Sequence, residues 1–101
     1  MLQANVKKSN LNYFVNLTLS GIKFEEFSYS LLFGFNKQMD VTTHWELVDS
    51  TTNEVHDRGM ALKMREKLLI YKLITAKLTK FTKDNYQVIL YFDNNLKLVV
   101  Y

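Results

Sequence analysis

The sequence predicts an α+β fold, in which an antiparallel sheet of about five to six strands carries one long helix on one face. Two observations predict this class. Apolar residues recur with a helical period over residues 60–82, and β-prone runs separated by turn residues stand on both sides of that segment. The expected order is β-β-β-β-α-β-β, in a single domain over residues 1–101 with residues 1–10 frayed at the start.

The composition excludes several classes of protein. A chain of 101 residues with 48% apolar side chains can bury one core. It has no cysteine, which excludes disulfides, thiolate zinc sites and a cysteine nucleophile. No apolar run reaches the ~20 residues that cross a bilayer, and the polar N-terminus does not resemble a secretory signal. We therefore expect a cytoplasmic protein without a membrane partner, and we find no repeat at solenoid spacing.

The first part of the chain is expected to form two strands. Residues 11–19 alternate between apolar and polar side chains, as in a half-buried strand that ends near Gly21. Residues 28–35 are aromatic and β-prone, and residues 36–40 supply turn chemistry after them. The segment between the strands fits either a helical turn or an irregular link, so the conformation of residues 22–36 stays open.

Residues 41–59 are interpreted as a hairpin. Two β-prone runs flank a Ser-Thr-Thr-Asn loop, in which Asn53 is expected to take a left-handed backbone conformation. The alternative is a capping box of Thr51 and Glu54 that starts the helix early. The hairpin is favoured because Gly59 separates this run from the better helix former that follows.

The predicted helix is apolar on two sides. One stripe should pack on the sheet, and it comprises Met60, Ala61, Met64, Leu68, Tyr71, Ile74 and Leu78. A second stripe, formed by Leu62, Leu69 and Leu73, projects nearly opposite. This second stripe is either an interface with a partner or a second copy, or it is covered within the chain, and both interpretations stay open.

The C-terminal segment is predicted to form a second hairpin. Strands at 86–92 and 96–101 are joined through residues 93–95, whose Asn-Asn pair suits a two-residue type I′ turn. That turn places Leu90 opposite Val99. Both faces of the hairpin are apolar, so the face turned away from the helix also needs cover, from other strands or from a second copy.

Positive charge is concentrated in residues 58–83, which makes nucleic-acid binding a candidate function. The basic side chains scatter around the predicted helix, so the expected contact is with phosphates and not with base edges. Nearby aromatic residues, among them Tyr91, could stack bases, although their spacing fits core positions better. The basic candidates are Arg58, Lys63, Arg65, Lys67, Lys72, Lys77, Lys80 and Lys83.

His44, Glu46 and His56 are the weak candidates for a metal or acid–base site, because two imidazoles and a carboxylate suit divalent metals. The hairpin register decides whether they meet. A four-residue loop places Glu46 opposite Asp57, with the histidines on opposite sides, whereas a three-residue loop places Glu46 opposite His56 and lets His44 join them. Exposed strand histidines are the commoner outcome, so we predict no metal and no cofactor.

These patterns favour a small non-enzymatic protein-binding module that docks to another protein or to itself. An inhibitor, an adaptor or an immunity-type protein has this character, as do accessory proteins of phages and mobile elements. The sequence contains no recognisable serine triad and no glycine-rich phosphate loop. The alternative is a nucleic-acid-binding accessory domain that uses the basic 58–83 segment, and the third is an enzymatic or metal site at His44, Glu46 and His56.

Overall fold

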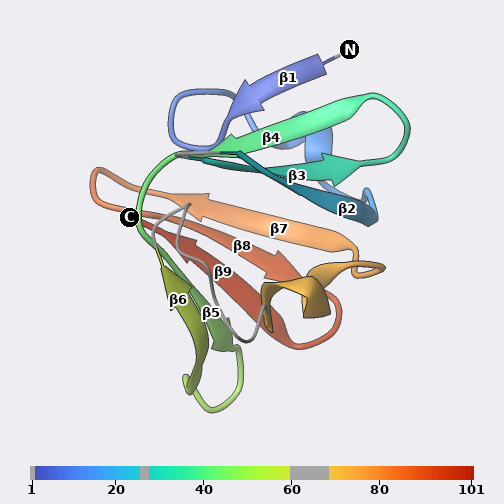
Figure 1. Cartoon of the computed structure of the whole chain (residues 1–101). Coiled ribbons are helices and arrows are strands. Elements are labelled where there is room, and N and C mark those ends of the chain that lie inside the picture. Colours follow the sequence, from blue (N-terminus) through green and yellow to red (C-terminus); the bar gives the residue numbers. More distant parts are fainter. Residues whose placement is uncertain (1, 26–27, 60–68) are drawn as a thin grey trace.

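The computed structural model of the chain is an all-β fold, and it describes residues 2–25, 28–59 and 69–101 (Figure 1). In this part of the chain nine strands form two sheets, accompanied by two short 3-10 helices. The 3-10 helices are η1 (Asn12–Phe14) and η2 (Leu69–Leu73). The strands are β1 (Leu2–Asn5), β2 (Leu19–Phe24), β3 (Tyr29–Phe33), β4 (Lys37–Val41), β5 (Trp45–Asp49), β6 (Val55–Gly59), β7 (Leu78–Lys83), β8 (Val88–Phe92) and β9 (Leu96–Val100).

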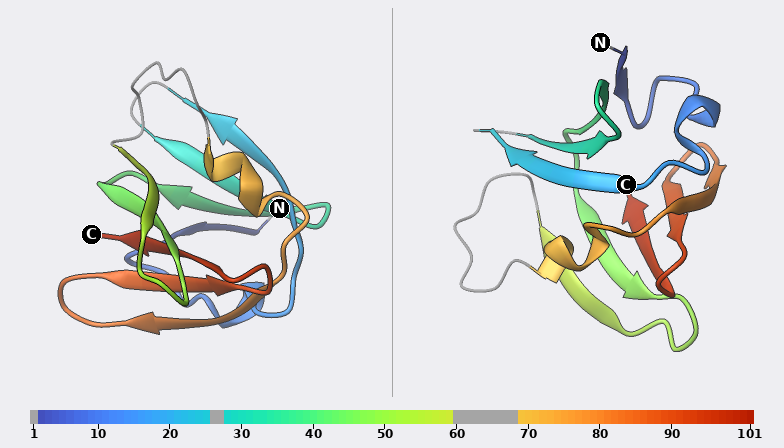
Figure 2. Two further views of the ribbon diagram at one scale, coloured as in Figure 1. Left: turned by 90° about the horizontal axis from the view of Figure 1, so that it is seen from below. Right: turned by 90° about the vertical axis from the view of Figure 1, so that its right-hand side faces the viewer.

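The two sheets lie on opposite sides of one core (Figures 1 and 2). The four-stranded sheet has the order β1-β4-β3-β2, and the five-stranded sheet has the order β6-β5-β9-β8-β7. Neighbouring strands are antiparallel except for β1, which lies parallel to β4. The short connection from β4 to β5 carries the chain between the sheets. η2 contacts β2 of one sheet and β6 of the other, so it covers one side of the core.

The core is filled by apolar side chains from both sheets and both 3-10 helices. Phe14, Leu31 and Leu90 are among those with no exposed surface. The ring of Tyr29 packs edge-on against that of Trp45, with centroids 5.5 Å apart, and this contact joins the two sheets. In the described part of the chain, no helix is long and apolar enough to cross a membrane.

One structural unit occurs twice in the fold. The first unit consists of η1, β2, β3 and β4, and the second consists of η2, β7, β8 and β9. Counterparts are 59 positions apart, as Leu19 at the start of β2 and Leu78 at the start of β7 illustrate. The strand registers of the two units correspond with the same offset, and both units carry a β-bulge at the start of their first strand. The chain therefore contains a duplicated supersecondary unit.

The two units meet through reciprocal backbone contacts. The Leu19 N–H donates to the Ala76 carbonyl at 2.8 Å, and its counterpart, the Leu78 N–H, donates to the Leu17 carbonyl at 3.0 Å. An isolated antiparallel bridge between counterpart residues lies at the same place. Because each of these contacts has its equivalent with the units exchanged, the units are related by an approximate two-fold axis.

Each unit enters its first long strand through a residue with a left-handed backbone. Asn16 has a φ of 72° and its counterpart Thr75 a φ of 79°. Their N–H groups donate to the carbonyls of Leu78 and Leu19, at 2.7 and 2.8 Å. This conformation interrupts any regular helix or strand at the same point in both units.

The predicted α+β class, with its helix at 60–82, is wrong. Residues 69–73 form only a short 3-10 helix and residues 78–83 form β7, while residues 60–68 lie outside the described residues. The left-handed Thr75 ends the helical run, and the β-branched residues around it favour extended backbone. The two apolar sides of the predicted helix reflect a change of period, from helical to alternating, within one segment. The predicted single antiparallel sheet is wrong as well, since the described residues form two sheets.

The first predicted strand, at 11–19, is also wrong. These residues form η1 and the link to β2, so Phe14 is fully buried whereas Tyr13 is 64% exposed. The N-terminal residues predicted to be frayed contain β1, and most of the predicted turn at 36–40 belongs to β4. The strand predicted at 28–35 is confirmed as β3.

The hairpin predicted at 41–59 is confirmed, as β5 and β6, and Asn53 has the expected left-handed backbone with a φ of 61°. The four-residue register holds only where Val48 lies opposite Val55, and none of the observed pairs follows the three-residue register. A bulge makes His56 an extra residue in β6, so that Glu46 lies opposite Arg58.

The C-terminal hairpin is confirmed as β8 and β9, but its predicted register is wrong by one residue. Leu90 lies opposite Leu98, not opposite Val99. Within the fully described turn, only Asn95 has a positive φ, at 67°, whereas a type I′ turn needs two such residues. The loop therefore has three residues and ends on a left-handed asparagine.

Candidate functional site

The five-stranded sheet has one face on the core and one face turned away from it, which we call the outer face. Val48 and Val99 lie on this outer face and are each only 6% exposed, yet both stand outside the described core cluster. The apolar members of the outer face are Val48, Val55, Ile89, Tyr91 and Val99, and its polar members are Glu46, Arg58, Lys80, Thr82 and Lys97.

Strand alternation decides which side chains point outward. In β9, Leu98 is fully buried in the core, so its neighbours Lys97 and Val99 point to the outer face. In β7, the bulge that follows Leu78 brings Lys80 opposite Tyr91 of β8. The local sequence thus places alternate charged and apolar side chains on one surface.

A row of three side chains, Lys80, Tyr91 and Lys97, crosses neighbouring strands of the outer face. The Lys80 ammonium lies 4.7 Å from the centroid of the Tyr91 ring, which is a cation–π contact. The Lys97 ammonium donates to the Asn53 side-chain oxygen at 3.0 Å. Because Lys97 lies opposite Val48, its aliphatic stem can cover that valine, in keeping with the small exposed fraction of Val48.

Glu46 is the acidic member of the outer face. It accepts a hydrogen bond from the Tyr101 phenol and lies 3.8 Å from the Arg58 guanidinium. The hydrogen bond to Glu46, with partial burial added, raises the pKa of Tyr101 above its ordinary value. The carboxylate is therefore engaged within the chain, and the remaining charge on the outer face is basic.

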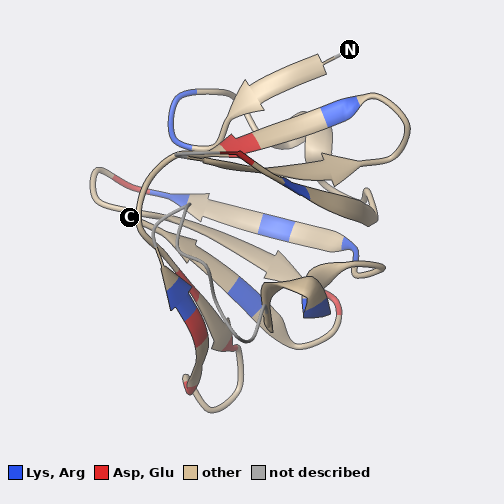
Figure 3. Cartoon of the chain, viewed as in Figure 1, with Lys and Arg blue, Asp and Glu red and all other residues tan. Residues whose placement is uncertain are grey.

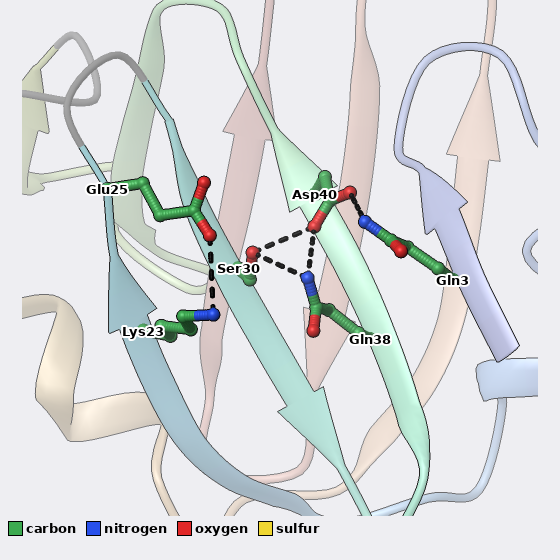
Figure 4. Close-up of polar contacts among 6 residues, drawn as sticks. All are labelled: Gln3, Lys23, Glu25, Ser30, Gln38 and Asp40. Atoms are coloured by element: carbon green, nitrogen blue, oxygen red, sulfur yellow. Dashed lines mark hydrogen bonds and ion pairs between the residues drawn. The ribbon is translucent and has the colours of Figure 1, made fainter. Parts of the chain in front are cut away.

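The equivalent face of the four-stranded sheet is polar and satisfied by its own hydrogen bonds (Figure 4). Asp40 accepts hydrogen bonds from Ser30 at 2.8 Å, Gln38 at 2.9 Å and Gln3 at 2.8 Å. Burial alone would raise the pKa of Asp40, but the hydrogen bonds from Gln38, Gln3 and Ser30 outweigh it and hold that pKa below its ordinary value. A carboxylate can be held on this face because three donors surround it.

The two units agree at inward positions and differ at outward ones. Ser30 corresponds to Ile89, and Asp40 corresponds to Val99. The inward pairs are Leu19–Leu78, Leu31–Leu90, Phe33–Phe92, Met39–Leu98 and Val41–Val100. Since one copy of the unit folds with a polar outer face, an apolar outer face is not a requirement of the unit. The apolar side chains on the five-stranded sheet need a different explanation.

The structure does not bring the three weak metal-site candidates, His44, Glu46 and His56, together as one site. Among the described residues, no group of three or more histidine or acidic side chains could hold a metal ion. Glu46 faces Arg58, and His56 is the extra residue of a bulge. The ring of His44 lies 5.6 Å from that of Tyr101, whose phenol donates a hydrogen bond to Glu46.

The leucines of the predicted second stripe do not form a common surface patch. Leu73 has no exposed surface and is part of the core, and Leu69 is partly buried against the same core. Leu62 lies outside the described residues.

The predicted nucleic-acid-binding residues are spread over several elements (Figure 3). Lys80 and Lys83 lie in β7, which is an edge strand, and Lys77 immediately precedes it. Lysines are typical of edge strands, where they oppose pairing with another chain, and the Lys83 ammonium already donates to the Ser9 carbonyl at 3.0 Å. The other described candidates are Lys72 in η2 and Arg58 in β6, whereas Lys63, Arg65 and Lys67 lie outside the described residues.

The sequence identifies the outer face only in part. It predicts that both faces of the 86–101 hairpin are apolar and that the outer one needs cover. It does not predict that β5 and β6 extend this face with Val48 and Val55, since that depends on the long-range pairing of β5 with β9. What distinguishes the face is that outward positions are apolar in the second unit and polar at the equivalent positions of the first. This difference can be seen only after the two units are superimposed by their strand registers.

Comparison of the chain with protein-family models, with curated proteins and with solved structures finds no match.

Proposed function

We propose that the protein is a non-enzymatic binding module that docks another protein on the outer face of its five-stranded sheet. The observation that carries the proposal is the contrast between equivalent positions, Ser30 and Asp40 in one unit against Ile89 and Val99 in the other. In the first unit the polar side chains of the outer face are satisfied by hydrogen bonds to one another, so this face can remain in contact with water. In the second unit the equivalent face is apolar, which suits contact with a partner.

The composition of the outer face supports this proposal. Protein interfaces combine an apolar centre, often containing tyrosine, with a polar and charged rim. The outer face has part of this layout, because Ile89 and Tyr91 lie on the central strand β8 while Arg58 and Lys80 lie on the edge strands β6 and β7. Two charged side chains, Glu46 and Lys97, lie on central strands as well.

Nucleic-acid binding is the competing function, and the lysines along β7 are the observation in its favour. Phosphate binding by such lysines would fall steeply as salt concentration rises. We favour protein docking because the neutral contacts of Lys80 and Lys83, together with the edge position of β7, account for these lysines. Retention of the protein on DNA or RNA at low salt, lost at moderate salt, would reverse this preference.

The test uses two matched variants at equivalent positions. Tyr91→Gln alters the outer face of the five-stranded sheet, and Leu32→Gln makes the same kind of change at the counterpart position of the four-stranded sheet. Both side chains are half-buried, so the two substitutions should have similar effects on the free energy of unfolding. Partner binding is measured by quantitative affinity purification from the native host, and self-association by light scattering.

The proposal expects a partner protein, or a second copy, to be bound by the wild type and by Leu32→Gln but lost with Tyr91→Gln. Equal binding by both variants, with both folded, would contradict docking on the outer face. Equal loss with both would show that the binding surface is not the one assigned.

A further inference from the structure

We infer that the partner segment that docks on the outer face is acidic, and that it places a carboxylate between the ammonium groups of Lys80 and Lys97. This inference rests on the proposed function and names the chemistry of the partner. The apolar side chains of the same segment would lie on the half-buried Ile89 in the neighbouring row of the sheet, where Val99 offers only 6% of its surface.

The strand register brings the two ammonium groups within reach of one ligand group. Lys80 in β7 and Lys97 in β9 are both cross-strand neighbours of Tyr91 in β8. Cross-strand neighbours on one face have Cβ atoms about 5 Å apart, so the two flexible lysines flank the ring at about that distance on each side. Because both lysine stems are flexible, an acidic side chain of the partner could contact both ammonium groups.

The lysines have no acidic partner within the described part of the chain. Lys80 lies over an uncharged ring, and Lys97 binds the neutral amide of Asn53. The described ion pairs are Lys23–Glu25 and Arg58–Glu46, at 3.4 and 3.8 Å, and neither includes these two lysines. Their charge is thus available to a ligand.

The same charges are missing from the equivalent row of the first unit. There the counterparts of Lys80, Tyr91 and Lys97 are Gly21, Leu32 and Gln38, none of them charged. The unit therefore folds without a basic row. Basic residues and apolar residues occur together on one outer face, which is the expected arrangement for a segment that offers both carboxylates and apolar side chains.

The same charges disfavour a second copy as the occupant. A second copy would present its own Lys80, Lys97 and Arg58, against a Glu46 that already accepts the Tyr101 hydrogen bond and pairs with Arg58. Like charges brought together across an interface oppose association. An acidic partner avoids this repulsion.

The experiment selects ligands from a random peptide library displayed on phage, with the full chain as the immobilised target. The variants are the double substitution Lys80→Gln/Lys97→Gln, the single substitution Tyr91→Gln and the control Leu32→Gln. Selected peptides are synthesised, and their Kd values are measured for each variant at low and moderate salt.

We expect selected peptides rich in Asp and Glu next to apolar residues. Their Kd should rise about tenfold in the double lysine variant, which corresponds to a loss of about 1.4 kcal/mol shared by two exposed ion pairs. Binding should be lost with Tyr91→Gln and unchanged with Leu32→Gln. Higher salt should weaken binding to the wild type more than to the double lysine variant.

The outcomes separate this inference from the proposed function. Peptides that need Tyr91 but carry no acidic residues, and bind the double lysine variant as well as the wild type, would overturn the acidic partner and leave docking in place. Peptides that bind Tyr91→Gln as well as the wild type would overturn both. If a single-stranded oligonucleotide such as oligo(dT) displaces the peptides and itself requires the two lysines, the natural ligand is a nucleic acid and the inference is wrong.

Discussion

Replacement of Thr75 by asparagine should stabilise the protein. Thr75 has a φ of 79°, in the left-handed region that β-branched side chains rarely adopt, whereas its counterpart in the first unit, Asn16, is of a type that tolerates a φ of 72°. The Thr75 side chain is exposed, and the bond from its N–H to the Leu19 carbonyl does not depend on the side chain. The left-handed conformation costs most residues roughly 1–2 kcal/mol, so Thr75→Asn should raise the free energy of unfolding by about 1 kcal/mol.

Urea unfolding measured by circular dichroism tests this expectation. The midpoint should rise with an unchanged slope, and the melting temperature should increase by about 4–8 °C for each kcal/mol in a domain of this size. The reverse substitution at the equivalent position, Asn16→Thr, should lower the free energy of unfolding by a similar amount. Unchanged or lower stability in Thr75→Asn would refute both the strain at Thr75 and its equivalence to Asn16.

Further substitutions test the polar face and the core. Asp40→Asn should lower the free energy of unfolding by about 1–2 kcal/mol at neutral pH, because an amide cannot accept all three hydrogen bonds that the carboxylate receives. Since the pKa of Asp40 is lowered in the folded state, the contribution of the carboxylate is complete above the ordinary value of 3.8 and is lost as pH falls through the lower folded value. Urea unfolding over a pH series should therefore show the wild type and the variant converging at acid pH, and a constant difference would contradict the role of the charge. Leu73→Ala should cost about 2–5 kcal/mol and Leu69→Ala clearly less, because only Leu73 is fully buried, and equal costs in urea unfolding would contradict their placement.

The helix at 60–82 could not be rejected from the sequence because its apolar spacing really is helical at the start. Ile70 and Leu73 are three positions apart, and both are buried residues of η2. From Leu78 onward the buried positions follow the alternation of a strand with a bulge. Thr75 marks the change between the two, but a threonine carries no sequence signal for a left-handed backbone, whereas an asparagine or glycine would have suggested a break.

The duplicated unit is equally hard to detect from sequence. Five counterpart positions are identical in the two units, and these are Leu19–Leu78, Leu31–Leu90, Phe33–Phe92, Asn36–Asn95 and Val41–Val100. Four of these pairs are core residues, where any apolar residue of suitable size is accepted, so identity is not required for the same packing. The features that the two units share are features of the backbone, such as the bulges and the left-handed residues, and these do not require one particular residue type.

The hairpins were predictable because their turn residues are local signals. The turn predicted around Asn53 is confirmed by the left-handed backbone of this residue. The turn predicted at residues 93–95 is present, but it is not of the predicted type I′. The registers were not predictable. A single extra residue such as His56 shifts the facing pairs. Beyond the bulge, Asp57 accepts a hydrogen bond from the Ile70 N–H of η2, a contact that the sequence of the hairpin does not reveal.

The central claim is that the apolar outer face serves binding and not folding, and a graft of the polar face tests it most directly. The triple variant Ile89→Ser/Lys97→Gln/Val99→Asn introduces the counterparts of Ser30, Gln38 and Asp40. Asparagine is used at position 99 because Glu46 lies opposite it and would repel a second carboxylate.

The account predicts that this graft folds, with a free energy of unfolding within about 2 kcal/mol of the wild type, and no longer binds the partner that the wild type binds. The decisive measurement is therefore partner binding by the folded graft variant. A graft variant that folds and binds like the wild type would contradict docking on the outer face, and one that fails to fold would contradict the claim that the apolar side chains are dispensable for the fold.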